Sequence, residues 1–149
     1  MRDLKNDVPA RLVAVPVLGG LAIAVYLTIV HYAGSGLYCL GLSGCDEVNQ
    51  SPYATVAGIP VALLGAGLCA VMLGVLWAEH NGRTPSLTAR PLLFGLALAG
   101  VLYYAYLTYL ELAVIRAVCV WCVTSAALTV IIFVLAVLRL RALFVQLRA

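Results

Sequence analysis

Four of the five cysteines in this 149-residue chain form two spaced pairs. Cys119 and Cys122 make a CxxC motif, while Cys39 and Cys45 lie in a glycine-rich segment. Residues three apart on a helix share a face, so the two sulfurs of a CxxC can reach disulfide distance. Such a motif serves as a redox dithiol, a structural disulfide or part of a soft-metal site. Because no histidine or further cysteine clusters with either pair, we expect redox chemistry and no metal.

The CxxC motif stands at the start of an apolar segment that we expect to be a helix. A cysteine in the first turn feels the positive end of the helix dipole, and Arg116 is close in sequence. Both features favour the thiolate, which is the form that attacks a disulfide. We expect Cys119 to be the more accessible sulfur and Cys122 to lie one turn deeper.

The elements that position these cysteines must be membrane helices. Hydrophobic residues make up 64% of the chain and charged residues 10%, against roughly 45–50% and 25% in soluble domains. This composition excludes a soluble globular protein and a nucleic-acid binder. A span needs about 20 apolar residues, and four segments qualify, at about 12–30, 59–78, 92–110 and 120–138. The prediction is one all-α domain, a four-helix membrane bundle with a sizeable loop at roughly 31–58.

The distribution of basic residues predicts the orientation of the bundle. Eight of the nine precede the first span, separate the second from the third, or follow the fourth: Arg2, Lys5, Arg11, Arg83, Arg90, Arg139, Arg141 and Arg148. Positively charged loops stay in the cytoplasm, so both termini are expected there, in a bacterial inner or plasma membrane. Both cysteine pairs then face outside, where disulfides persist. A mobile loop dithiol beside a fixed CxxC suggests an electron relay by thiol–disulfide exchange.

The order of these features resembles a known family. The run from Cys39 through Cys45 and Ser51 to Pro60, followed by the late CxxC, is similar to the bacterial branch of the vitamin K epoxide reductase family. The resemblance implies a four-helix bundle that encloses a quinone, such as menaquinone or ubiquinone. It also implies that the protein re-oxidises a separate thioredoxin-like, DsbA-like partner outside the membrane and passes the electrons to the quinone.

The same resemblance assigns roles to individual residues. It implies that Cys39 exchanges with the partner, that Cys45 passes electrons to Cys119, and that Cys122 delivers them to the quinone. Ser51 matches a family hydroxyl that donates a hydrogen bond to a quinone carbonyl. A donor at this position suits the chemistry because the carbonyl oxygen gains negative charge on reduction.

Further polar residues lie at the outer end of the third span. Four tyrosines gather there, and an interfacial aromatic belt is the default interpretation: Tyr103, Tyr104, Tyr106 and Tyr109. Tyr104 or Tyr106 is a candidate to point inward and contact the quinone ring. We expect Glu111 to pair with Arg116, with a proton relay to the quinone as the alternative.

Two other functions stay open at this point. A DsbB-type oxidase also has four spans and two external cysteine pairs, but its CxxC comes first, and here the order is reversed. A non-enzymatic membrane protein would use the cysteines as metal ligands or as staples. The leading hypothesis is a quinone-dependent thiol oxidase, and redox cycling of the cysteines distinguishes it from the last alternative.

Overall fold

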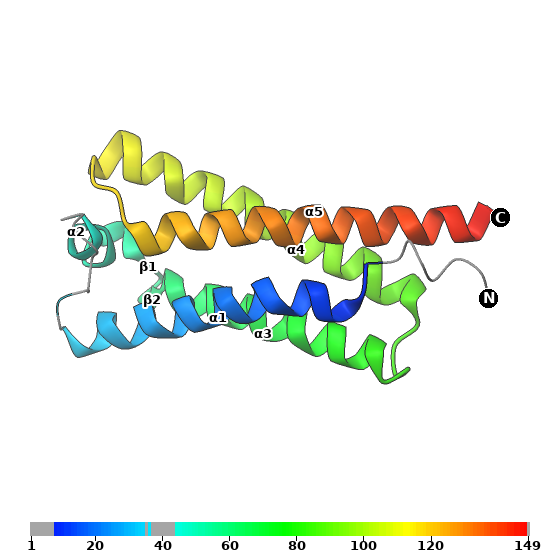
Figure 1. Ribbon diagram of the computed structural model, residues 1–149. Coiled ribbons are helices and arrows are strands. Elements are labelled where there is room, and N and C mark those ends of the chain that lie inside the picture. The colour runs from blue at the N-terminus through cyan, green and yellow to red at the C-terminus, as the bar shows by residue number, and fades with distance from the viewer. Residues whose placement is uncertain (1–7, 35, 37–43, 149) are drawn as a thin grey trace.

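The computed structural model describes residues 8–34, 36 and 44–148, and four long helices dominate it (Figure 1). They are α1 (Ala10–Ala33), α3 (Val61–His80), α4 (Ser86–Tyr109) and α5 (Val120–Arg148). Helix α4 continues into a π-helix, η2 (Leu110–Ile115). All four are long and apolar enough to cross a membrane. The predicted all-α bundle with four spans is confirmed.

Two helices extend further than the apolar segments indicated. Helix α4 begins at Ser86, capped by Pro85, so Pro91 lies inside the helix although we expected a helix start close to it. Helix α5 continues to Arg148, ten residues past the expected end at position 138. Hydropathy finds the apolar part of a helix, whereas the helix itself ends where its backbone hydrogen bonds end.

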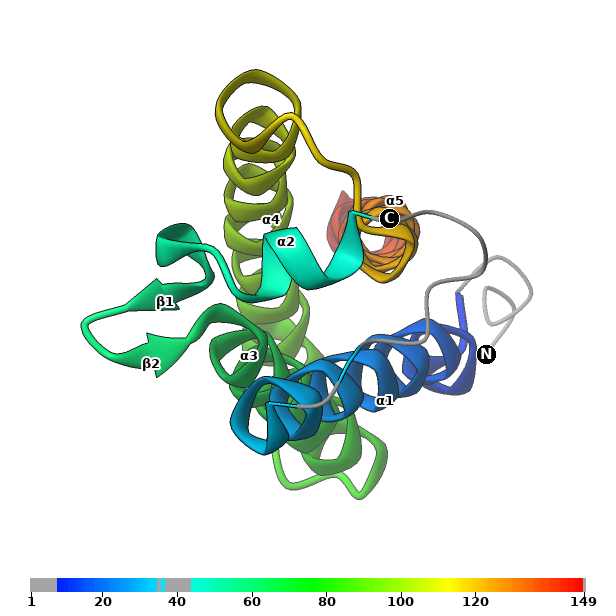
Figure 2. The same ribbon diagram turned by 90° about the vertical axis from the view of Figure 1, so that its left-hand side faces the viewer.

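The segment between α1 and α3 is short and compact where it is described. It contains α2 (Cys45–Asn49), the 3₁₀ turn η1 (Pro52–Ala54), and the strands β1 (Thr55–Val56) and β2 (Ile59–Pro60), which pair antiparallel. The turn between the strands has positive φ at Ala57 and Gly58, as a two-residue hairpin requires. Figure 2 shows α2 lying across one end of the bundle with the hairpin beside it.

Side chains from all four long helices form the main buried cluster. Its members are Val13, Val17, Met72, Leu76, Leu93, Ala97, Ile132 and Ala136. Large apolar side chains also cover the outside of the bundle, and Val15, Leu102 and Val130 are among those that are exposed. A bundle that is apolar both inside and outside suits a lipid environment.

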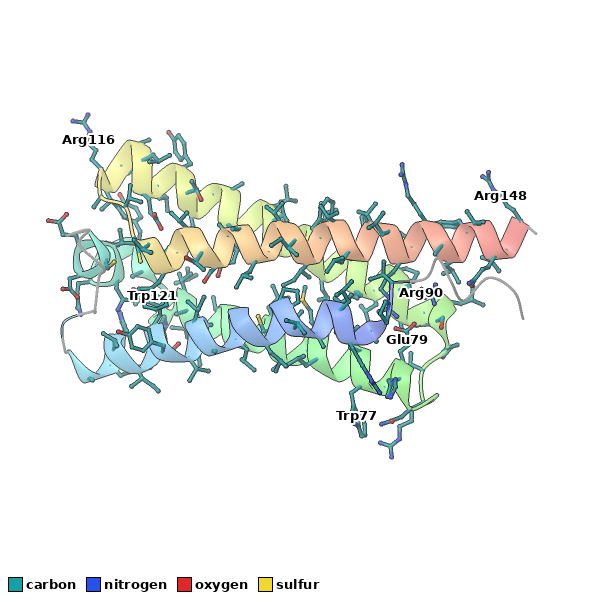
Figure 3. The ribbon with its side chains drawn as sticks, viewed as in Figure 1. Trp77, Glu79, Arg90, Arg116, Trp121 and Arg148 are labelled. Atoms are coloured by element: carbon teal, nitrogen blue, oxygen red, sulfur yellow. The ribbon has the colours of Figure 1, made fainter. Side chains whose placement is uncertain are left out.

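A buried ion-pair network ties three helices together at the end opposite α2 (Figure 3). Glu79 of α3 accepts a 2.9 Å contact from Arg139 of α5 and a 3.3 Å contact from Arg90 of α4. Arg90 also donates to the backbone carbonyl of Arg139. Charges at such a depth require close partners. The start of α1, the α3–α4 connection and the end of α5 share this end of the bundle (Figure 1).

Candidate active site

The CxxC motif lies at the opposite end of the bundle, where α5 begins. Cys119 immediately precedes the helix, and its carbonyl accepts the first-turn hydrogen bond from the N–H of Val123 at 3.0 Å. Cys119 and Cys122 are free thiols. The side chain of Cys119 is 0% exposed, while Cys122 is partly exposed. The expectation that Cys119 is the more accessible sulfur is therefore wrong.

The segment around α2 explains why Cys119 is covered. Cys45, at the start of α2, is also 0% exposed and shares one buried cluster with Cys119, Leu27 and Val30. Just before it, the backbone of Gly44 packs so closely that an added Cβ would lie 2.7 Å from both the N and the O of Val118. The two chain segments that carry Cys45 and Cys119 are therefore in direct contact.

The states of the loop cysteines are only partly described. Cys45 is disulfide-bonded, and Cys39 lies outside the described residues. Helix α2 is held against α1 by a hydrogen bond of 2.8 Å between Nδ1 of His31 and the carbonyl oxygen of Asn49. The predicted convergence of the loop pair and the CxxC is confirmed for Cys45, since one buried cluster contains it together with Cys119.

The environment of Cys119 favours its thiolate. A hydrogen bond from the Cys122 thiol lowers the pKa of Cys119, and the backbone N–H groups of Cys122 and Trp121 act in the same direction. Burial and the nearby Glu111 oppose them without reversing the shift of the pKa. The backbone N–H groups of the first helical turn thus stabilise the Cys119 thiolate, as expected. Arg116 does not, because it has a left-handed backbone, is exposed and points away from the bundle (Figure 3).

Trp121, between the two cysteines, packs toward α1. Its ring centroid lies 5.3 Å from that of Tyr26, with the rings inclined by 58°. Both side chains pack against the buried cluster of Cys45 and Cys119. Trp121 thus helps to close this cluster from the side of α1 (Figure 3).

A cavity of about 390 Å³ adjoins the CxxC at Cys122. Its walls come from all four long helices, η2, α2 and the segment after α2, and most of them are apolar, including Leu64, Leu68 and Leu107. Among the polar residues that line it are Ser51, Tyr104, Glu111 and Ser125. Cys122 lines the cavity as well. This volume and this lining, apolar with a few polar groups, are typical of a small-molecule site.

The cavity distinguishes between the residues proposed to bind a quinone. Ser51 and Tyr104 line it, and the Tyr104 hydroxyl is in hydrogen-bond contact with the side chain of Ser125. Tyr106 is 54% exposed and is not part of the lining, contrary to the expectation for it. Residues two apart on a helix point in directions about 200° apart, so Tyr104 and Tyr106 cannot both face the cavity. Ser51 also donates a 2.8 Å hydrogen bond to the carbonyl of Val48.

Glu111 does not pair with Arg116, as we had expected. Its side chain is 5% exposed in η2, whereas Arg116 is exposed on the far side of that element. Oε2 of Glu111 accepts a hydrogen bond of 3.5 Å from the backbone N–H of Cys119, and the carboxyl group is also in hydrogen-bond contact with the Cys122 side chain. The available signal was a single acid inside an apolar span, which is a functional indication in itself.

No group of three or more His, Cys, Asp or Glu side chains gathers as a metal site within the described part of the chain. The chemistry that the arrangement supports is sulfur exchange. Cys119 shares a buried cluster with Cys45, and Cys122, which packs against that cluster, also lines an apolar cavity.

Comparison with known proteins agrees with this geometry. The family model described as "Vitamin K epoxide reductase family" matches residues 11–137. The thiol-disulfide oxidoreductase LTO1 of Arabidopsis thaliana is 30% identical over 118 residues, which are 75% of this chain and 31% of the plant protein. The chain thus spans about a third of the length of that relative. Since the family model matches most of the chain, reaching into all four long helices and including both cysteine pairs, the chain belongs to the vitamin K epoxide reductase family.

Proposed function

We propose that this protein is a membrane thiol–disulfide oxidoreductase that oxidises the dithiol of a thioredoxin-like, DsbA-like protein and reduces a membrane quinone. One observation carries the proposal. Cys45 and Cys119 share a buried cluster, and Cys122, one turn further on, lines an apolar cavity. Family membership and the name of the plant relative support the thiol chemistry.

The proposed relay has three exchanges, and each moves two electrons and two protons. The partner dithiol first reduces the loop disulfide. A thiolate of the loop, at Cys45, then attacks Cys119 in the Cys119–Cys122 disulfide, and Cys39 attacks Cys45 to release Cys119. A sulfur of low pKa leaves readily in such exchange, and the pKa of Cys119 is lowered. The reformed dithiol of Cys119 and Cys122 then delivers its electrons into the cavity.

The burial of Cys119 explains why two cysteine pairs are needed. A soluble protein cannot reach a sulfur that is 0% exposed, so the partner must exchange with the loop. We assign that contact to Cys39, which lies outside the described residues. The loop pair then transfers the electrons from the partner to the buried Cys119, which α2 covers.

The cavity fits a quinone. Its apolar walls suit a substituted ring, and the Tyr104 hydroxyl can donate a hydrogen bond to a carbonyl oxygen. Ser51 can do the same once its hydroxyl turns from the carbonyl of Val48. When bound, the quinone supplies a two-electron, two-proton acceptor that diffuses in the membrane. Cys122, which lines the cavity, would then lie beside it.

We propose the orientation that the basic residues predict. The ends of the bundle are chemically different, with α2 and the CxxC at one and the Glu79–Arg90–Arg139 network at the other. Both termini are assigned to the cytoplasm of a bacterium, and the cysteine pairs to the outer face of its plasma membrane. Lipid then surrounds the exposed apolar faces of the long helices.

The direct test combines quinone reduction with thiol trapping. Purified full-length protein, given a reduced thioredoxin-like protein without oxygen, should reduce added quinone. Cys122→Ser should abolish this reduction and accumulate a mixed disulfide between Cys119 and the loop. Cys69→Ser is the matched control, because Cys69 is a half-buried thiol in α3 that belongs to neither pair. Cysteines that never change redox state with quinone would reject the proposal in favour of a structural or metal-binding role.

A further inference from the structure

Glu111 occupies a position that the electron relay does not use. It lies where α4 gives way to the π-helix η2, and its side chain is 5% exposed. Single π-helical turns are rare and often occur at functional sites. The carboxyl group lies at the boundary between the CxxC and the cavity, because it contacts Cys119 and Cys122 and also lines the cavity.

The surroundings of Glu111 contain sulfur and hydroxyl groups. Within the described residues, no Lys or Arg forms an ion pair with its carboxylate. The titratable side chains nearest to it belong to the CxxC, at Cys119 and Cys122, with Tyr104 on the cavity wall. A carboxylate inside an apolar span is costly to keep. A carboxyl group that contacts a reacting thiol can repay that cost by exchanging a proton with it.

The reaction at the cavity requires such an exchange. When the dithiol becomes a disulfide, two S–H bonds break and one S–S bond forms between Cys119 and Cys122. Two electrons and two protons leave for the acceptor. Cys119 has its pKa lowered and gives up its proton readily, but Cys122 is the hydrogen-bond donor that stabilises the Cys119 thiolate. Cys122 therefore needs a base within contact distance.

We propose that Glu111 is a catalytic base for this step, taking the proton of the Cys122 thiol and releasing it into the cavity to the oxygen of the acceptor. The second proton is the one that Cys119 gives up on becoming a thiolate, and water returns it to the other oxygen of the acceptor. The carboxylate is regenerated in each cycle, so atoms and charge balance. The inference rests on the proposed quinone reduction. The hydroxyls of Ser51, Tyr104 and Ser125 also line the cavity, but a hydroxyl is a much weaker base than a carboxylate near neutral pH.

Glu111→Gln tests the proposal with little change of shape. The amide keeps an oxygen that accepts the N–H of Cys119, but it cannot take up a proton. We expect the rate of quinone reduction by the reduced enzyme to fall about 10²–10⁴-fold, the range of general-base catalysis. Thiol exchange between the loop pair and the CxxC should not slow, because loss of the negative charge that raises the pKa of Cys119 favours its thiolate. Glu47→Gln, an exposed acid in α2, is the matched control and should change neither rate.

Chemical rescue separates a proton-transfer role from a structural one. In Glu111→Ala, added formate should restore quinone reduction in proportion to its concentration, since a small carboxylic acid can enter the space that the side chain leaves. The proposal is overturned if Glu111→Gln reduces quinone at the wild-type rate, or if both variants lose thiol exchange to the same extent as quinone reduction. A wild-type protein that does not reduce quinone at all would instead refute the proposed function.

Discussion

Replacing Gly44 by alanine tests the contact that brings the two cysteine pairs together. An alanine Cβ at this position would lie 2.7 Å from the backbone N and O of Val118 and 3.2 Å from Cβ of Ala117. Real Cβ atoms are not found so close to backbone atoms, so α2 or the segment before α5 must move. Gly44 has φ −88°, which alanine adopts freely. The expected effect is therefore steric alone.

The consequence follows from what the contact holds in place. Overpacking a tight site costs about 1–3 kcal/mol, and a shift of about 1 Å between reacting groups can slow a reaction by about 10²-fold. We expect Gly44→Ala to slow exchange between Cys45 and Cys119 by about 10- to 100-fold. Reduction of quinone by a chemically reduced CxxC should be less affected, because Gly44 does not line the cavity and Cys122, the cysteine that does, lies in α5.

The assay follows formation of the mixed disulfide in the Cys122→Ser background, by quenching with a thiol-alkylating reagent that changes the mass of the chain. Gly36→Ala is the matched control from the same connection, since among the residues that the structure describes its Cβ would meet only Oδ2 of Asp46, at an ordinary 3.7 Å. A Gly44→Ala protein that exchanges as fast as the control would refute the reasoning, because it would show that the close packing on Val118 does not position the sulfurs.

Two further predictions concern the sulfurs and the cavity. The hydrogen bond from Cys122 lowers the pKa of Cys119, so Cys119 should remain a thiolate at lower pH than an ordinary cysteine. Cys122→Ala has no donor and should shift the pH profile of mixed-disulfide formation to higher pH than that of Cys122→Ser. Identical pH profiles for the two variants would contradict this cause. Tyr104→Phe should raise KM for quinone about 2- to 10-fold, as expected for one lost hydrogen bond. Tyr106→Phe should leave KM unchanged because that side chain lies outside the cavity, and equal effects of the two variants would place the quinone elsewhere.

The sequence was sufficient to predict the bundle and the convergence of the cysteine-bearing segments. Both predictions depend on features that can be read directly from the order of residues. These features are the length of the apolar segments and the positions of the two cysteine pairs relative to them. The structure confirms four helices, with Cys45 and Cys119 in one cluster. The assignment of their end of the bundle to the outside of a membrane stays a prediction.

The accessibility of the sulfurs could not be predicted in the same way. A position in the first helical turn suggested an accessible Cys119, but access depends on what covers the turn. Here α2 covers it through the close approach of Gly44 to Val118. That contact joins residues more than seventy positions apart in sequence, and no local pattern encodes it.

The directions of Tyr104 and Glu111 depended on details of helix geometry. Hydropathy predicts the same span whichever face a tyrosine takes, so Tyr104 and Tyr106 were equivalent candidates. For Glu111, charge pairing in sequence suggested Arg116, which is five residues away. Arg116 is the left-handed residue at which η2 ends, so the chain turns there and the arginine is exposed while the acid stays buried. The way this helix ends therefore decided that Glu111 does not pair with Arg116.

The spacing of the CxxC gives its two sulfurs different surroundings within one helical turn. Cys119 is a fully buried member of the cluster that contains Cys45, whereas Cys122 packs against that cluster and also forms part of the cavity wall. A thiol that enters through the loop and an acceptor that enters the cavity therefore never have to meet. A disulfide between the two sulfurs is the only connection that the exchange requires, because it forms in one step and is broken in the other. Glu111 contacts both cysteines and lines the cavity. In the proposed step the proton of Cys122 passes through this carboxylate, while the electrons pass from the sulfurs to the acceptor.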